Sequence, residues 1–410
     1  MSDRILGTLS GLVCCVLLAG AGGPRPNAPP PQKPFHELRK QQAEYAGPGR
    51  ETSAPADVKE VLIGYFGPGD PAHPEGGDLW RAAQLAVDEA NRQGGFQGKP
   101  FRLVPAWSEN PWKAGAAEVV RLAYREKVWA ILGGIDGPST HLAEQVVAKA
   151  RLPLVSPVST DKTVNLANVP WMFSCAPGDH LQAPRLAAEI SVRSDKRPFV
   201  LMSAADHDSR MFVAELTKSF SERRLAPQNH LEFPQDMPNV AELLSGIVKA
   251  KPGAVLIVAG AHDSARLVGG LREKGFAGPV FGGPAMGRRR FLEEAGAAAE
   301  GVVFPLLYVP QEASQPLVKT FEARFGRPPD YAAAHAYDAA RLLIAAIGKA
   351  GLNRARIGDA LRALSPWQGA TGTVTWDATG SNTRPVPLGT IRNGRIERAP
   401  GSAGATAPAP

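Results

Sequence analysis

Cysteine is scarce in this sequence, with three residues in 410, and Cys14 and Cys15 both fall in the apolar segment that opens the chain. If that segment is removed on export, Cys175 keeps no intramolecular partner, so a disulfide framework is excluded. Cys175 stands among apolar residues at the end of an expected strand, and no family motif places a histidine beside it. We interpret it as a small buried hydrophobic residue rather than a nucleophile.

The motifs of common enzymes are also missing. The sequence has no GxxxxGK(S/T) phosphate loop, no GxSxG nucleophile turn and no HExxH zinc helix. Residues 159–162 match SxxK, but the SDN and KTG elements that accompany it are absent. Asp206, His207 and Asp208 are adjacent and do not all point at one ion from regular structure, and no distant pattern completes a ligand set. We therefore expect no catalytic residue, no metal and no cofactor.

Positive charge is present but is not concentrated. The formal net charge is +7, and the one short basic cluster is formed by Arg288, Arg289 and Arg290. No basic stripe is interleaved with aromatic residues, which disfavours nucleic-acid binding. A moderately basic, solvated surface is the simpler interpretation, and such a surface favours anionic ligands by steering.

The first 57 residues differ in composition from the remainder. Residues 5–21 form an apolar run broken by glycines, preceded by Arg4 and ending in Ala-Gly-Ala, which predicts a signal peptide over residues 1–21. An uncleaved membrane anchor and lipid attachment at Cys15 are the alternatives, although no small residue precedes that cysteine. Residues 22–57 are rich in proline and glycine and predict a linker, and residues 399–410 predict a disordered tail. We expect an exported protein in the periplasm or cell envelope, with membrane tethering left open.

From residue 60 onward, strand-like and helix-like patterns alternate, which predicts an α/β fold with parallel sheets. The expected strands cover residues 61–66, 101–106, 129–133, 152–156, 199–203, 254–259 and 279–283. Apolar stripes at helical spacing lie between them, and a longer helix is expected over residues 331–349. Residues 372–380 and 387–396 have the character of hairpins. Two βαβ series, up to about residue 175 and from 199 to 283, predict two doubly wound lobes with a cleft between them.

Two loops of small polar residues fall within residues 130–160. The order is strand, Gly-rich loop, helix, strand and Ser/Thr loop, so both loops emerge at the carboxyl ends of adjacent parallel strands. Open α/β sheets hold their ligands at that edge. We therefore expect hydroxyl donors around one small polar or anionic molecule, with helix capping as the alternative role. These residues are Ser139, Thr140, Ser156, Ser159 and Thr160.

Several segments together resemble one protein family. They are GYFGP, LAVDEANRQGGFQGKPFRLV, VWAILGGIDGPST, LPLVSPVST and GFAGPVFGG. In this order they resemble the Leu/Ile/Val-type extracytoplasmic solute-binding proteins of ABC importers, which have the type 1 periplasmic binding protein fold. The resemblance covers residues 58–396. It implies three hinge crossings and an interlobe ligand cleft, with lobe 1 built from residues 58–176 and 300–367 and lobe 2 from 177–299 and 368–398.

The resemblance also implies where a ligand carboxylate lies, against Gly137 to Thr140 and against the loop from Ser156 to Thr160. Backbone N–H groups at a helix start favour an anion for independent reasons. The acidic residue that pairs with the ligand ammonium in amino-acid binders is replaced here by Pro284, so a branched-chain amino acid is not the expected ligand. Other polar contacts are expected from Asp206, His207, Asp208 and His262. An apolar wall is expected from Tyr65, Trp80, Trp107, Tyr308 or Tyr337.

Three functions are therefore considered. The first is a solute-binding protein that captures a small ligand bearing a carboxylate, an amino acid or a related compound, and delivers it to the permease subunits of an ABC importer. The second is a ligand-sensing or envelope interaction module of the same fold. The third is a hydrolase or dehydrogenase, which lacks a nucleophile, base or dinucleotide motif in this sequence. We expect a monomer.

Overall fold

The computed structural model describes residues 49–110, 114–194, 197–234, 240–310 and 315–400. The expected signal peptide lies outside these residues, as do most of the expected linker and nearly all of the expected tail. Within the described part of the chain, no helix combines the length and apolar character needed to cross a membrane.

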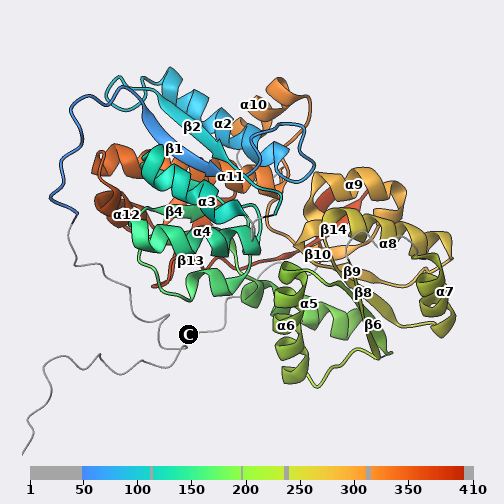
Figure 1. Ribbon diagram of the computed structural model, residues 1–410. Coiled ribbons are helices and arrows are strands. Elements are labelled where there is room, and N and C mark those ends of the chain that lie inside the picture. The colour runs from blue at the N-terminus through green and yellow to red at the C-terminus, as the bar shows by residue number, and fades with distance from the viewer. Residues whose placement is uncertain (1–48, 111–113, 195–196, 235–239, 311–314, 401–410) are drawn as a thin grey trace, which may run out of the picture. The chain divides into compact units, whose positions relative to one another are not determined.

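Six parallel strands form the first sheet, in the order β13-β5-β4-β3-β1-β2 (Figure 1). They are short and nearly all buried, as expected of parallel strands that are covered by helices on both faces. Their bounds are β1 (Val61–Phe66), β2 (Phe101–Ala106), β3 (Ala130–Gly133), β4 (Leu154–Ser156), β5 (Met172–Pro177) and β13 (Ser381–Asn382).

Seven strands form the second sheet, in the order β15-β14-β10-β9-β8-β6-β7. Strands β6 to β10 pair in parallel with one another. A C-terminal hairpin adds β14 and β15 at one edge, where both pairings are antiparallel. Their bounds are β6 (Phe199–Ala204), β7 (Asn229–Phe233), β8 (Ala254–Val258), β9 (Val280–Gly282), β10 (Val303–Pro305), β14 (Leu388–Arg392) and β15 (Arg395–Arg398). A separate hairpin joins β11 (Trp367–Gly369) to β12 (Gly372–Val374).

Helices cover both faces of each sheet and bury their apolar stripes against it. With the first sheet lie α2 (Gly77–Arg92), α3 (Ala116–Val120), α4 (Gly137–Ala150), α10 (Gln315–Phe325), α11 (Tyr331–Ala350) and α12 (Arg354–Ala363). With the second lie α5 (Asp179–Arg193), α6 (His207–Glu222), α7 (Ala241–Ala250), α8 (Ala261–Glu273) and α9 (Arg289–Ala295). Each sheet thus has its own hydrophobic core, and we refer to the two assemblies as the first and second lobe.

Several helices begin where a short polar side chain satisfies a free backbone N–H. Asp136 caps α4, Asp206 caps α6, Asp330 caps α11 and Asn353 caps α12, each by accepting a hydrogen bond from the N–H three residues later. This is the favoured arrangement at a helix N-terminus. Asp136 follows β3 by three residues and Asp206 follows β6 by two residues. These capping hydrogen bonds therefore also hold the short loops between each strand and the next helix.

The chain passes between the lobes three times, after β5, after β10 and between β13 and β14. The expected number of crossings is therefore present, but their positions differ from the expected lobe ranges. Strand β10 falls within residues 300–367, yet it pairs with β9 and β14 of the second sheet. Strand β13 falls within residues 368–398, yet it pairs with β5 of the first sheet. Strand β13 consists of two polar residues and has no apolar run, whereas β10 lies in the apolar segment 302–309, whose sequence does not show which sheet it joins.

All seven strands expected from the sequence are present, and the helix expected over 331–349 is α11. Cys175 is fully buried in β5, where burial raises the pKa of its thiol. This agrees with its interpretation as a small core residue. The C-terminal hairpin is formed by β14 and β15 as expected, whereas residues 372–374 pair with the preceding residues 367–369 rather than with a later strand.

Candidate functional site

A cavity of about 590 Å³ lies between loops from both lobes. Its walls come from the segments that follow β1, β2, β3 and β4 in the first lobe and β6, β8 and β9 in the second. All of these are the carboxyl ends of parallel strands, where open α/β sheets bind their ligands. The cavity is therefore the candidate ligand site, as expected from the two sequence loops.

The start of α4 forms one wall of this cavity. Asp136 accepts a hydrogen bond from the Ser139 N–H at 2.8 Å, and the Ser139 hydroxyl hydrogen-bonds back to Asp136. The Thr140 hydroxyl donates to the Asp136 carbonyl at 2.6 Å. Ser139 and Thr140 are fully buried and do not line the cavity. Their hydroxyls therefore organise the helix cap, the alternative that the sequence had left open.

The Gly137 N–H, at the first turn of α4, faces the second lobe. It donates to both carboxylate oxygens of Asp208, each at 3.1 Å. Burial, followed by the nearby charge of Asp136, raises the pKa of Asp208 to about 8. A carboxyl group of the protein itself thus lies at the helix N-terminus where the sequence resemblance implies a ligand carboxylate.

The loop after β4 contributes unevenly to the cavity. Thr160 lines it, and its carbonyl accepts a hydrogen bond from the Asp179 N–H at 2.8 Å. Ser156 is fully buried, 3.4 Å from the Thr140 hydroxyl. Ser159 is also buried, and its hydroxyl has no hydrogen-bond partner among the described residues. Of the three hydroxyl residues expected in this loop, Thr160 alone reaches the cavity wall.

The polar second-lobe residues expected as ligand contacts all line the cavity: Asp206, His207, Asp208 and His262. Asp206 accepts hydrogen bonds from the Ser209 N–H at 2.9 Å and from the Ser209 hydroxyl at 2.7 Å, so its carboxylate caps α6. His262 lies at the start of α8, with its Nδ1 2.5 Å from Oε2 of Glu294. Pro284 follows β9 and also lines the cavity, at the place where the sequence lacks the expected acidic residue.

The expected aromatic residues are distributed over different parts of the structure. Trp107 lines the cavity. Tyr65 is buried and packs edge-to-face on Trp80 with ring centroids 5.0 Å apart, and burial raises the pKa of its phenol. The Tyr337 hydroxyl donates to Glu89 at 2.5 Å. Tyr65, Trp80 and Tyr337 are therefore outside the cavity wall and take part in packing.

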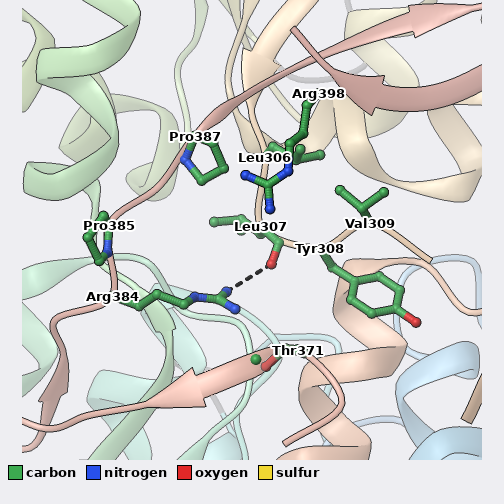
Figure 2. A pocket seen from close by; sticks show the side chains of 10 residues that line it. Leu306, Leu307, Tyr308, Val309, Thr371, Arg384, Pro385, Pro387 and Arg398 are labelled. Carbon is green, nitrogen blue, oxygen red and sulfur yellow. Dashed lines mark hydrogen bonds between the residues drawn. The ribbon is translucent and has the colours of Figure 1, made fainter. Parts of the chain in front are cut away.

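Tyr308 lines a different, smaller cavity of about 290 Å³, beside the segments that cross between the lobes (Figure 2). In Figure 2 the Arg384 side chain points toward the backbone of Leu307, whose carbonyl accepts its hydrogen bond at 2.9 Å. Burial raises the pKa of Tyr308. Its ring therefore belongs to the crossing segments rather than to the candidate ligand site.

Sequence reasoning missed a charged cluster that joins the lobes. Arg288 lines the cavity and pairs with Asp330 at 2.8 Å and with Glu75 at 3.4 Å. Arg290 also pairs with Glu75, at 2.7 Å. The Arg288 guanidinium lies 5.9 Å from the ring centre of Tyr331, which lines the cavity too. The sequence shows the triple-arginine run but predicts a solvated surface, because the first-lobe partners Glu75, Asp78 and Asp330 lie far away in the chain.

Comparison with known sequences identifies related proteins. A family model described as periplasmic binding protein matches residues 63–395. An amino acid binding protein from Pseudomonas aeruginosa is 30% identical over 158 residues, which are 36% of this chain and 41% of that protein. The match thus spans less than half the length of this curated relative.

Solved structures show the same fold. The branched-chain amino acid transporter substrate-binding protein LivJ from Streptococcus pneumoniae, solved with isoleucine, superposes with a TM-score of 0.75 at 23% identity, over 83% of this chain and 98% of LivJ. A solute-binding protein of an ABC transporter from R. palustris, solved with benzoate, superposes with a TM-score of 0.74 at 18% identity, over 83% of this chain and 95% of that protein.

The family match covers most of the chain, and it agrees with the two parallel-dominated sheets and with the position of the cavity. The resemblance expected from the sequence motifs is confirmed. The relatives named above are binding proteins rather than enzymes, and this chain is likewise a binding protein. It belongs to the periplasmic binding protein family.

Proposed function

We propose that this protein is an extracytoplasmic solute-binding protein that captures a small carboxylate-bearing ligand in the cavity between its lobes and delivers it to an ABC importer. The observation that carries the proposal is the contact of the Asp208 carboxyl group with the Gly137 N–H at the start of α4. It supports the proposal because a carboxyl group already accepts hydrogen bonds at this helix end, where the helix dipole and the free N–H groups favour an anion.

This contact and two similar proteins support the proposed ligand class. Isoleucine and benzoate, which were found in the two similar proteins, differ in shape and in the presence of an ammonium group, but each carries a carboxylate. In this chain, the cavity wall also includes Thr160, Asp206 and His262 as polar groups and Trp107 as an aromatic surface. We propose that the ligand carboxylate lies at Gly137 and Thr160, and that the second-lobe residues contact the remainder of the molecule.

A thermal-shift screen of the full chain against amino acids, amides, aromatic acids and dicarboxylates tests the ligand class. A compound that binds the folded state raises Tm in a concentration-dependent way. Calorimetry of each hit beside its methyl ester then tests the carboxylate contact, and we expect the ester to bind at least tenfold more weakly. Equal affinity of acid and ester, or stabilisation by none of these compounds, would overturn the proposed ligand class.

Delivery to an importer needs a separate test. We expect cells that carry the gene to take up the identified ligand faster at low external concentration than cells that lack it. A Gly137→Ala version of the protein, impaired in binding, should not restore uptake. Equal uptake in both strains, with a ligand that the pure protein binds, would favour the alternative role of a ligand-sensing module.

A further inference from the structure

Three side chains with metal-binding donor atoms meet where the two lobes are in contact. His141 lies on α4, Asp161 follows β4, and His207 is the first residue of α6 in the second lobe. The Nε2 atoms of His141 and His207 lie 3.0 and 2.8 Å, respectively, from Oδ2 of Asp161. All three donor atoms lie within 4.8 Å of one another. The sequence shows His207 only beside its neighbouring aspartates, so it gave no sign of this grouping.

The Asp161 carboxylate is held in one orientation. Its Oδ1 accepts hydrogen bonds from the Thr163 N–H at 2.8 Å and from the Thr163 hydroxyl at 2.7 Å. Its Oδ2 faces the two imidazoles, and the side chain is 1% exposed. One oxygen is thus used to fix the carboxylate and the other is directed at the histidines, as in metal sites whose ligands are oriented by outer hydrogen bonds.

His141 has a second carboxylate behind it. Its Nδ1 lies 3.4 Å from Oε2 of Glu144, one helical turn later, while its Nε2 faces Asp161. A histidine that binds a metal through one nitrogen commonly directs the other at a carboxylate, which fixes the ring and makes it a better donor. Glu144 is buried, so this arrangement is not a loose surface pair.

The donor set selects the kind of ion. Two imidazole nitrogens and one carboxylate oxygen suit Zn²⁺ and similar transition metals, whereas Mg²⁺ and Ca²⁺ prefer oxygen ligands throughout. The two rings meet edge-to-face with centroids 5.6 Å apart, so they do not stack over the space between their Nε2 atoms. His207 also lines the interlobe cavity, which leaves one side of the group accessible to water or another small ligand.

We propose that His141, Asp161 and His207 form a binding site for one divalent transition-metal ion, with Zn²⁺ the best fit, and that this ion links the two lobes. The metal takes the Nε2 lone pairs, so protons held there leave to solvent as the metal–nitrogen bonds form. Because His207 comes from the second lobe, the ion stabilises the arrangement in which the lobes are in contact. Ligands that favour one arrangement raise each other's affinity.

Calorimetric titration of the chelator-treated full chain with ZnCl2 tests the site. We expect one ion per chain, and at least a tenfold loss of affinity in His141→Ala and in His207→Ala. His262→Ala is the matched control, because it removes another cavity histidine that pairs with Glu294 instead, and its Zn²⁺ affinity should equal that of the wild type. Wild-type affinity in both site variants, or no binding at millimolar Zn²⁺, would overturn the proposal and leave a hydrogen-bonded contact between the lobes.

A measurement on the unaltered protein removes any dependence on how the variants fold. Co²⁺ added to the wild type should give the visible absorption of a low-coordinate nitrogen and oxygen site, and Zn²⁺ should abolish it at one equivalent. A spectrum identical to that of aqueous Co²⁺ would contradict the site. Ligand binding by the same chelator-treated protein tests the proposed solute-binding function independently, so the failure of one proposal is distinguishable from the failure of the other.

Discussion

The carboxyl group of Asp208, on α6 of the second lobe, accepts a hydrogen bond from the backbone N–H of Gly137, at the start of α4 in the first lobe. The two residues are 71 positions apart, and each carboxylate oxygen lies 3.1 Å from the amide nitrogen. If a ligand carboxylate binds at this helix N-terminus, as proposed above, it must compete with Asp208 for the Gly137 N–H. Asp208 would then lower the affinity of the site for its ligand.

Removing this competitor should strengthen ligand binding. In Asp208→Ala we expect the affinity for the carboxylate ligand found by screening to rise several-fold, measured by calorimetry, because the ligand no longer competes with the Asp208 carboxyl group for the Gly137 N–H. Asp263→Asn is the control, since Asp263 also lines the cavity and pairs with Arg266 on its own helix. Weaker binding in Asp208→Ala would instead indicate that Asp208 contacts the ligand directly.

Adding a methyl group at Gly137 should have the opposite effect. A Cβ atom there would lie 2.2 Å from Oδ1 of Asp208, inside the space that a carboxylate needs next to the N–H. We expect Gly137→Ala to weaken ligand binding at least tenfold, equivalent to about 1.4 kcal/mol. Gly260 lines the cavity between the lobes, and a Cβ at that position meets no atom within 4 Å, so Gly260→Ala should retain the wild-type affinity. Equal affinities in the two variants would exclude Gly137 from the site.

Ser139 should affect stability more than binding. Its hydroxyl accepts hydrogen bonds from the N–H groups of Ile135 at 3.2 Å and Asp136 at 3.3 Å, and it is fully buried. We expect Ser139→Ala to lower the free energy of unfolding by about 1 kcal/mol, the typical net contribution of a hydrogen bond, while Asp136 remains the N-cap residue of α4. Denaturant unfolding measures this loss. A large loss of ligand affinity at unchanged stability would restore the role first considered for Ser139, that of a ligand contact.

The strands were predictable because buried parallel strands are short apolar runs that are bounded by loop residues. Strand β7 was not predicted because its residues Asn229–Phe233 are mostly polar and exposed at the sheet edge, and β13 was not predicted because it has only two residues, both polar. Local pattern does not distinguish such strands from loops. The lobe boundaries shifted because β10 and β13 are the strands beside two of the crossings, and local sequence does not show which sheet each of them joins.

The position of the site was predictable and its internal contacts were not. Strand order placed both polar loops at one sheet edge, and the cavity lies there. Whether a hydroxyl faces a ligand or a helix cap depends on side-chain direction, which distinguishes Thr160 from Ser139. Long-range pairs such as Arg288 with Glu75, 213 residues apart, leave no local signal at either residue.

His335 should make the protein sensitive to acid. It is fully buried on α11, its Nδ1 lies 2.7 Å from the Tyr331 carbonyl, and burial lowers its pKa from 6.5 to about 3. Between these values the unfolded chain binds a proton that the folded chain does not, so stability falls as pH falls, by about 1.4 kcal/mol per unit. We expect the difference in unfolding free energy between wild type and His335→Gln to shift in favour of the variant from pH 6.5 to 4. A constant difference over that range would contradict this.

Arg288 should be the most sensitive of the charged residues that join the lobes. Its side chain is 12% exposed and pairs with the nearly buried Asp330 and with Glu75. Removing one member of a buried pair leaves an uncompensated charge, so we expect Arg288→Met to lower the free energy of unfolding by about 3 kcal/mol. Arg102 pairs with Glu60 at the surface, with the two side chains 50% and 45% exposed, and Arg102→Met should cost less than about 1 kcal/mol. Equal losses in the two variants, measured by denaturant unfolding, would show that Asp330 is well solvated without its partner.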